Sequence, residues 1–205
     1  MRLFVLGASG RTGQELVAQG LERGHRVTAF GRSALTHCDN ALTTILGSVM
    51  SVDDLGAALP NHDAVVSALG TRGVGPTSLL RDSAHAVTEA MLHAGVKRLI
   101  VISSTLVAGS TWLDRLVART VLRHHARDQR AMEDVVTRSG LDWTVVRAPV
   151  LTNRPLTQRY ALMSGSLGDA RTARVGRRDL ARLMLLAVER GSHLKQKVGI
   201  VRDSI

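Results

Sequence analysis

Short apolar runs that alternate with helix-like stretches are the feature that most limits the fold of this chain. A continuous apolar run of four to eight residues is typical of a strand buried on both faces of a parallel sheet. Helical spacing of apolar residues is clearest over 11–23, 77–94, 112–139 and 178–190, with a break in the middle of the third stretch. We predict strands at 3–6, 26–30, 44–46, 64–68, 99–102 and 143–146, and a late edge strand at 197–201.

This alternation predicts an α/β fold in which helices connect parallel strands. The expected architecture is a doubly wound parallel sheet in three α/β/α layers, with strand order 3-2-1-4-5-6. The chain has 205 residues and 44% hydrophobic residues, and no linker divides it, so we predict one domain over 1–205. Ligands bind beyond the carboxyl ends of such strands. The loops near 71–76 and 150–170, which follow predicted strands, are therefore the expected substrate pocket.

A glycine-rich turn, Gly7-Ala8-Ser9-Gly10-Arg11-Thr12-Gly13, joins the first predicted strand to the first predicted helix. Gly7 allows a tight turn, Gly10 lets a pyrophosphate approach the backbone, and Gly13 lets the helix pack close to the sheet. The helix N-terminus then offers free N–H groups and a partial positive charge to the phosphates. This context predicts the Rossmann type of dinucleotide site.

The end of the second predicted strand indicates which dinucleotide is bound. Proteins that prefer NAD carry an Asp or Glu about 20 residues beyond the glycines, bonded to the ribose 2′-hydroxyl. Here the strand ends Ala29-Phe30-Gly31-Arg32-Ser33, without a carboxylate. Arg32 is placed to meet a 2′-phosphate, and Arg11 could reach the same group. We therefore predict NADP(H) as the cofactor.

Charge and cysteine content limit which partners and which cellular compartment we expect. The formal net charge is +10, carried mostly by scattered arginines without interleaved aromatic residues, so a nucleic-acid partner is not expected. One cysteine, Cys38, excludes an internal disulfide and suits a reducing compartment. The first apolar run is too short for a secretory signal, and no window is long enough to span a membrane. We expect a cytoplasmic protein without a membrane partner, and no spacing of histidines or cysteines indicates a metal.

Several short motifs fall in an order that resembles one family. They are Gly31-Arg32, Asp63-Ala64-Val65-Val66, Leu69-Gly70-Thr71-Arg72, Pro76-Thr77, Ser139-Gly140-Leu141 and Pro155-Leu156-Thr157, together with the glycine turn. Over nearly the whole chain, this series is similar to the atypical short-chain dehydrogenases/reductases that include the NADPH-dependent flavin reductase/biliverdin-IXβ reductase and NmrA-like proteins.

The resemblance implies a set of cofactor contacts. Ser48 stands where the family has an acidic residue after the third strand, beside Val49, and Ser103 and Ser104 stand where it places hydroxyls near the nicotinamide. Capping of the strand end is the alternative role for these two serines. Together with the turn, the expected cofactor-binding residues are Gly7, Ser9, Gly10, Arg11, Thr12, Gly13, Arg32, Ser48, Val49, Leu69, Gly70, Arg72, Ser103 and Ser104.

The catalytic motif of the full short-chain dehydrogenases, Tyr-x-x-x-Lys, is absent. The only tyrosine is Tyr160, followed four residues later by Ser164. In the window where the motif would fall stand His124 and His125, which point in different directions on a helix and so form no metal pair. We expect both on the surface. Any activity is therefore expected to depend on positioning, with Ser104 orienting the nicotinamide or the acceptor.

Two classes of function remain open from the sequence. The favoured one is an NADPH-dependent reductase that transfers hydride to a flavin, quinone or similar planar acceptor. The alternative is an NADP(H)-binding redox sensor or regulator of the NmrA type without catalysis. A third possibility is a subunit or assembly factor that keeps the fold for protein contacts. Neither the acceptor nor the oligomeric state follows from the sequence.

Overall fold

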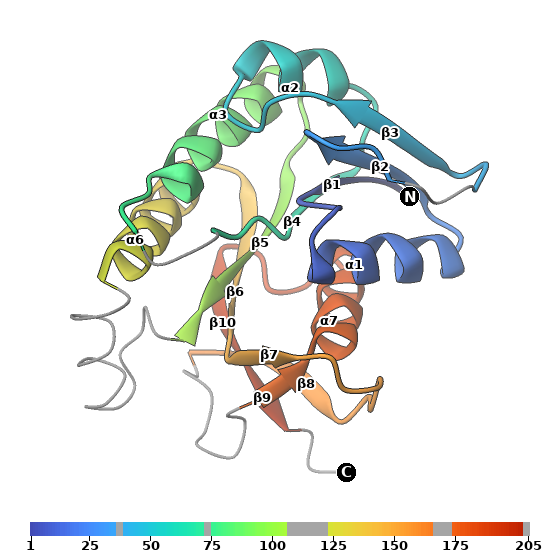
Figure 1. Ribbon diagram of the computed structural model, residues 1–205, viewed down its shortest axis with the longest axis vertical. Helices are drawn as coiled ribbons and strands as arrows, with labels where there is room; N and C mark the ends of the chain where they lie inside the picture. Colours follow the sequence, from blue (N-terminus) through green and yellow to red (C-terminus); the bar gives the residue numbers. More distant parts are fainter. Residues whose placement is uncertain (36–38, 72–74, 106–122, 166–173, 203–205) are drawn as a thin grey trace.

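The computed structural model describes residues 1–35, 39–71, 75–105, 123–165 and 174–202. Its centre is an eight-stranded sheet with the order β3-β2-β1-β4-β5-β6-β10-β8 (Figure 1). The predicted order of the first six strands is therefore confirmed. Those strands pair in parallel. Their bounds are β1 (Arg2–Leu6), β2 (Arg26–Gly31), β3 (Leu42–Leu46), β4 (Ala64–Ser67), β5 (Arg98–Ser104) and β6 (Asp142–Ala148).

Helices cover both faces of the sheet and complete the expected three layers (Figure 1). Apolar residues of both sheet faces are buried, which explains why the central strands read as continuous apolar runs. One face packs against α1 (Arg11–Glu22) and α7 (Arg177–Glu189). The other packs against α2 (Val52–Ala58), α3 (Leu79–His93) and α6 (Arg123–Arg138).

Part of the last third of the chain differs from the prediction, although β6 and α7 lie within two residues of the ranges predicted for them. The strand expected at the edge, β10 (Gln196–Arg202), lies inside the sheet, because the antiparallel strand β8 (Tyr160–Ser164) covers its outer side. The stretch after β6, expected as a loop, contains β7 (Val150–Thr152), which pairs with β9 (Arg174–Gly176). These three-residue strands are too short for an alternating pattern to reveal them.

A short helix, α2, was also missed by apolar periodicity. Its N-terminus is marked instead by a capping pair, in which the Ser51 hydroxyl accepts a hydrogen bond from the Asp54 N–H at 3.1 Å. This Ser-x-x-Asp pattern is visible in the sequence and belongs to the usual start signals of helices.

The glycine turn packs the start of α1 directly onto the end of β1. Gly7 has a φ of +75°, a conformation that side chains disfavour. A Cβ atom on Gly13 would lie 2.1 Å from the Gly7 carbonyl oxygen, so only glycine fits there. Both expectations for these two glycines, the tight turn and the close helix approach, are confirmed.

We predict that Gly13→Ala lowers stability by about 3 kcal/mol, because the added methyl overpacks rigid backbone. Gly56→Ala is the matched control, since Gly56 lies within α2 and a Cβ there meets no atom within 4 Å. It should raise stability by about 0.5–1 kcal/mol. Urea unfolding of both variants measures the difference, and equal stabilities would contradict the packing of the turn described above.

Candidate functional site

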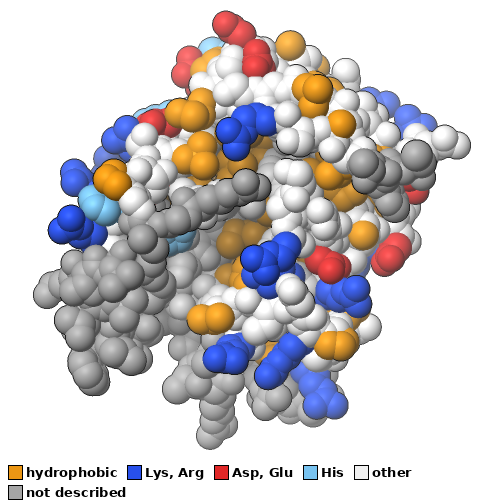
Figure 2. All heavy atoms as spheres, in the orientation of Figure 1, with side chains coloured by type: hydrophobic (Ala, Val, Ile, Leu, Met, Phe, Trp, Pro, Cys, Tyr) orange, Lys and Arg blue, Asp and Glu red, His pale blue; other side chains and the backbone are white. Residues whose placement is uncertain are grey.

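The expected site residues gather at one edge of the sheet. Since β1, β2, β4, β5 and β6 run parallel, the segments that follow them meet at their carboxyl ends. Figure 2 shows this face hollowed between α3 and α1, with hydrophobic side chains at the bottom of the hollow. The glycine turn, Arg32, the segment Leu69–Gly70 and the serines of β5 all belong to this edge.

The N-terminus of α1 is left without a side-chain cap. Its N-cap residue is Gly10, no side chain accepts a hydrogen bond there, and the first turn contains no acidic residue. The Gly10 N–H itself donates to the Gly7 carbonyl at 2.9 Å, which closes the turn. An uncapped first turn with positive partial charge is the arrangement that proteins use for phosphate groups. The residues of the turn thus fit the pyrophosphate of a dinucleotide.

Arginines surround a cleft of about 210 Å³ beside this helix start. Arg11 from α1, Arg154 from the segment after β7, and Arg177 and Arg178 from α7 line it. Arg178 pairs with Glu15 at 3.1 Å. Burial lowers the pKa of Arg177, because it disfavours the charged form of the guanidinium. The like charge of Arg11 lowers this pKa further. Figure 2 shows Lys and Arg side chains gathered over this part of the face. The surroundings of the turn therefore favour an anion.

The ends of β2 and β3 offer less defined contacts. Arg32 is exposed just beyond β2. Ser48 is exposed after β3, where its backbone N–H donates to Asp54 Oδ2 at 2.8 Å. Asp54 thus brings a carboxylate beside Ser48, at the place where the related family carries an acidic residue. Val49 is half-buried and packs against the core under α2.

The two serines at the end of β5 lie on opposite faces of the sheet, as alternation in a strand requires. The Ser103 hydroxyl is buried and donates to Glu133 Oε1 at 2.7 Å. Ser104, which pairs in register with Ala148, is half-buried. Ser103 therefore belongs to a buried network under α6, and its expected contact with the cofactor stays a prediction, as does that of Ser104.

Glu133 is the centre of that network. Its side chain is 2% exposed and pairs with Arg147 at 2.7 Å and with Lys197 at 3.0 Å. Burial alone would raise the pKa of the Glu133 carboxyl, but hydrogen bonds from Arg147, Ser103 and Lys197 outweigh burial and lower it. The carboxylate therefore stays charged and ties α6 to β5, β6 and β10 beneath the carboxyl edge.

His125 is a polar residue of this edge that is less exposed than the predicted surface position implies. It was expected on the surface, but it is half-buried, and its Nδ1 hydrogen-bonds with Thr71 Oγ1. Burial lowers the pKa of His125, and the nearby Asp128 charge only partly opposes this. The spacing of His125 with Met132 and Val136, seven and eleven residues later, is the signal that could have placed it on the buried face of α6.

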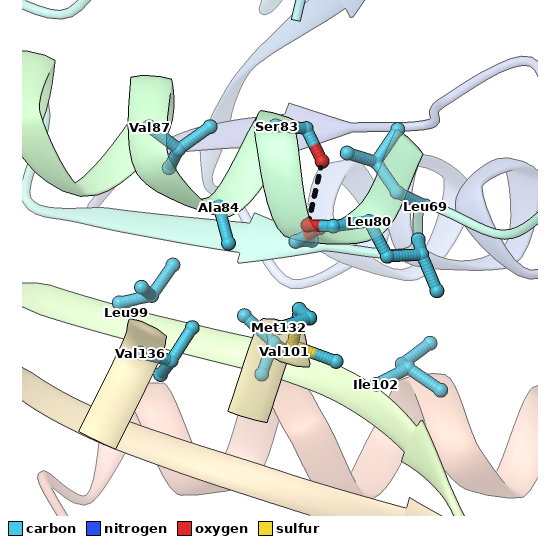
Figure 3. Close-up of a pocket in the computed structure, with 11 residues that line it drawn as sticks. Leu69, Leu80, Ser83, Ala84, Val87, Leu99, Val101, Ile102, Met132 and Val136 are labelled. Atoms are coloured by element: carbon cyan, nitrogen blue, oxygen red, sulfur yellow. Dashed lines mark hydrogen bonds between the residues drawn. The ribbon is translucent and has the colours of Figure 1, made fainter. Parts of the chain in front are cut away.

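A narrow apolar pocket lies between α3, α6 and the ends of β4 and β5 (Figure 3). Its cavity of about 20 Å³ has room for roughly one water molecule. Figure 3 shows Leu69, Leu80 and Ile102 at one end and Val87, Leu99 and Val136 at the other. A planar acceptor does not fit inside it, so an acceptor would have to lie at the open carboxyl edge.

For some expectations, the structure informs only on the residues that it describes. Arg72 lies outside the described residues, as do the next two residues of the loop near 71–76. Among the residues that the structure describes, no group of three or more His, Cys, Asp or Glu could hold a metal ion. Across the same described part of the chain, no helix has the length and apolar character needed to cross a membrane.

We predict that Glu133→Gln lowers stability at neutral pH by about 3–5 kcal/mol, because two cations lose their buried partner. The folded pKa of Glu133 is lowered, so its contribution is complete above the usual value of 4.5 and is lost as pH falls through the lower folded value. The gap between variant and parent should therefore narrow below about pH 4.5.

The control for this measurement is Glu89→Gln, on the exposed side of α3, which should change stability by less than about 0.5 kcal/mol. Urea unfolding across a pH series gives both values. A Glu133→Gln variant as stable as Glu89→Gln at neutral pH would contradict the network.

Known proteins resemble this chain over most of its length. YhfK of Bacillus subtilis, named an uncharacterised sugar epimerase, is 26% identical over 199 residues, which cover 92% of this chain and 88% of YhfK. A Veillonella parvula short-chain dehydrogenase/reductase solved with NADP has a TM-score of 0.82 at 19% identity, covering 99% of this chain and 95% of that one.

A candidate NADH-flavin reductase from Streptococcus pneumoniae has a TM-score of 0.78 at 24% identity, covering 99% of this chain and all of that one (100%). At these identities the two solved structures establish the fold alone. The family model described as NAD(P)H-binding matches residues 7–190, which include the glycine turn, the ends of β2, β4 and β5, and α7. This chain therefore belongs to the NAD(P)H-binding family.

Proposed function

We propose that this protein is an NADPH-dependent reductase that transfers hydride to a flavin, quinone or similar planar acceptor. The observation that carries the proposal is the uncapped N-terminus of α1, held by glycines at the carboxyl edge and followed at the end of β2 by Arg32 instead of a carboxylate. Membership of the NAD(P)H-binding family supports the cofactor class. The choice of NADP(H) over NAD(H) rests on Arg32 and Arg11.

The proposed cofactor contacts follow the chain around this edge. The backbone of the turn from Gly7 to Gly13 would hold the pyrophosphate, with Ser9 and Thr12 beside it, and Arg32 and Arg11 would meet the 2′-phosphate. Leu69, Gly70 and Ser104 would lie beside the nicotinamide half. Bound there, the dinucleotide would supply the hydride, while the protein supplies orientation and shields the reacting atoms from water.

The far wall of the proposed acceptor site is fixed by one buried carboxylate. Asp179, in the first turn of α7, is 1% exposed and accepts the N–H groups of Thr157 at 3.0 Å and Gln158 at 2.8 Å. This contact holds the segment after β7 against α7. A preformed wall suits a reaction that depends on positioning.

A reductase fits these residues better than an epimerase, although YhfK carries that name. Full active sites of the short-chain dehydrogenase type rely on a tyrosine whose proton transfer a lysine assists. Here Tyr160 lies in β8, its hydroxyl donates to the Arg174 carbonyl at 3.5 Å, and Ser164 occupies the lysine position. Transfer of hydride to a flavin or quinone needs no such tyrosine. We place the reaction in the cytoplasm, since the sequence has a single cysteine.

Steady-state NADPH oxidation with a panel of flavins and quinones tests the proposal. Turnover with at least one of these acceptors is expected. Tight NADPH binding without oxidation by any acceptor would contradict it and would favour an NADP(H)-binding sensor of the NmrA type.

Calorimetry should show tighter binding of NADPH than of NADH, by roughly tenfold or more, since one charge-assisted phosphate contact contributes about 1.5–3 kcal/mol. Arg32→Ala should remove most of this difference without weakening NADH binding. Arg26→Ala, at the opposite end of the same strand, removes the same charge and should leave the difference intact. Equal affinities of the parent protein for the two dinucleotides would refute the NADP(H) assignment.

Gly10→Val should abolish dinucleotide binding while the fold survives. The backbone of Gly10, at φ −75° and ψ 160°, accepts a valine, and a Cβ there approaches only the Gly7 carbonyl, at 3.1 Å. The branched side chain would stand where the pyrophosphate must approach. Calorimetry with NADPH tests the loss of binding, and a thermal unfolding curve tests whether the fold survives. Unchanged NADPH affinity would show that the cofactor lies elsewhere.

A further inference from the structure

Four residues form one stripe along α6 that reaches from the apolar pocket to the carboxyl edge. His125, Gln129, Met132 and Val136 recur at spacings of four, three and four, which places them on one face of a helix. Met132 and Val136 line the pocket (Figure 3). Because His125 lies about two turns before Met132, it lies outside the lining of the pocket, where it contacts Thr71, two residues beyond the lining residue Leu69.

His125 is held there by the segment that follows β4. Its Nδ1 hydrogen-bonds with Thr71 Oγ1, and Thr71 comes directly after Gly70, where the nicotinamide half of the proposed cofactor would lie. Among the described residues, none hydrogen-bonds with its other ring nitrogen, Nε2. Thr71 thus fixes the ring from one side and leaves the opposite nitrogen for a ligand.

The surroundings of His125 favour its neutral form. Burial lowers its pKa. The nearest carboxylate, Asp128, already accepts the backbone N–H groups of Leu80 at 3.1 Å and Arg81 at 3.0 Å, so it offsets this only in part. When the Thr71 hydroxyl donates to Nδ1 of a neutral ring, the proton of the ring must be on Nε2. His125 would then present an N–H donor.

The neighbouring polar residue also lacks a full set of partners among the residues that the structure describes. Gln129 is 7% exposed, and no described residue hydrogen-bonds with its Oε1. A buried polar atom without a partner costs about 1–3 kcal/mol. A purely structural polar cluster would satisfy its members internally, so this one is better explained as part of a ligand site.

We propose that His125, oriented by Thr71, donates a hydrogen bond from Nε2 to the carbonyl oxygen of the acceptor and stabilises the negative charge that develops there. This inference rests on the proposed reductase function and assigns its acceptor to carbonyl-bearing ring systems. Proteins use such preorganised donors where an oxyanion forms.

The reaction step balances without a further reagent. A quinone gains two electrons and one hydrogen as the C4–H bond of the dihydronicotinamide breaks, and NADP⁺ is released. The new charge falls on the quinone oxygen that His125 faces, and this oxyanion then takes one proton from water to give the hydroquinone. His125 begins and ends the step as a neutral imidazole.

The test compares two acceptors that differ in where charge develops. A naphthoquinone forms an oxyanion when it gains hydride, whereas the N-methylphenazinium cation becomes neutral and has no such oxygen. Removal of one donor from an enclosed oxyanion site lowers turnover by about 10²–10³-fold, and for the half-buried His125 we expect about tenfold to a hundredfold. His125→Ala should therefore lower naphthoquinone turnover by that factor and leave phenazinium turnover and NADPH affinity nearly unchanged.

Two variants of Thr71 separate the effect of its hydroxyl, which orients His125, from the effect of its size. Thr71→Val removes the hydroxyl at nearly constant shape and should lower naphthoquinone turnover, whereas Thr71→Ser retains the hydroxyl and should not. His124→Ala is the matched histidine control, since Nε2 of His124 lies 3.1 Å from Nε of Arg123, whereas Thr71 hydrogen-bonds with His125. Imidazole ¹⁵N shifts give a readout without turnover: His125 should carry its proton on Nε2 in the parent protein and lose this preference in Thr71→Val.

The outcomes distinguish this inference from the proposed function. If the parent protein reduces neither acceptor with NADPH, the reductase function itself fails. If it reduces both, and His125→Ala slows both equally or neither, the role of His125 is refuted while the reductase function stands. Protonation of His125 on Nδ1 in the parent protein would also overturn the proposal.

Discussion

The contact between Gly13 and the Gly7 carbonyl is the constraint on which the rest of the site depends. Because no Cβ separates α1 from the end of β1, the first turn of the helix lies at the carboxyl edge of the sheet. Its N–H groups remain uncapped there, and the helix axis directs their partial charge toward the same edge. The anion site is thus a consequence of how closely a helix and a strand can pack.

Charges on the two sides of this edge have different roles. Arg11, Arg154 and Arg177 lie around an open cleft and favour an anionic ligand. Beneath the edge, Glu133 holds Arg147 and Lys197 in a buried network that joins α6 to three strands. The first group lines the cleft, where Arg177 also donates to Asn153 Oδ1 at 2.7 Å, while the second fixes the helix that carries His125. A buried carboxylate with two cationic partners therefore supports the site without taking part in it.

Much of the fold could be predicted because burial on both faces of a sheet leaves a strong mark in the sequence. The six central strands, their order and the glycine turn follow from short apolar runs and from glycine spacing. The last third could not be predicted in the same way. β7 and β9 have three residues each, and the pairing of β10 with β8 depends on tertiary contacts that no local pattern records.

The site was predictable to a similar extent. The turn and Arg32 could be proposed as cofactor contacts because backbone geometry and phosphate chemistry favour particular residues at particular spacings. His125 was missed because its neighbour His124 suggested an exposed pair, although the stripe with Met132 and Val136 marks the buried face. Ser103 was assigned to the cofactor by resemblance, and that contact stays a prediction. Its hydroxyl donates to Glu133, a partner 30 residues away that no local pattern links to it.

A titration of ¹⁵N-labelled protein with NADP⁺, followed by amide NMR, tests most directly whether the uncapped helix start binds the dinucleotide. We expect the amides of Arg11, Thr12 and Gly13 to shift together and to saturate with the binding isotherm. A second open hollow lies near the amino ends of the strands and is lined by Met1, Asn61 and His62. Shifts confined to that hollow, with the amides of the turn unchanged, would contradict the account.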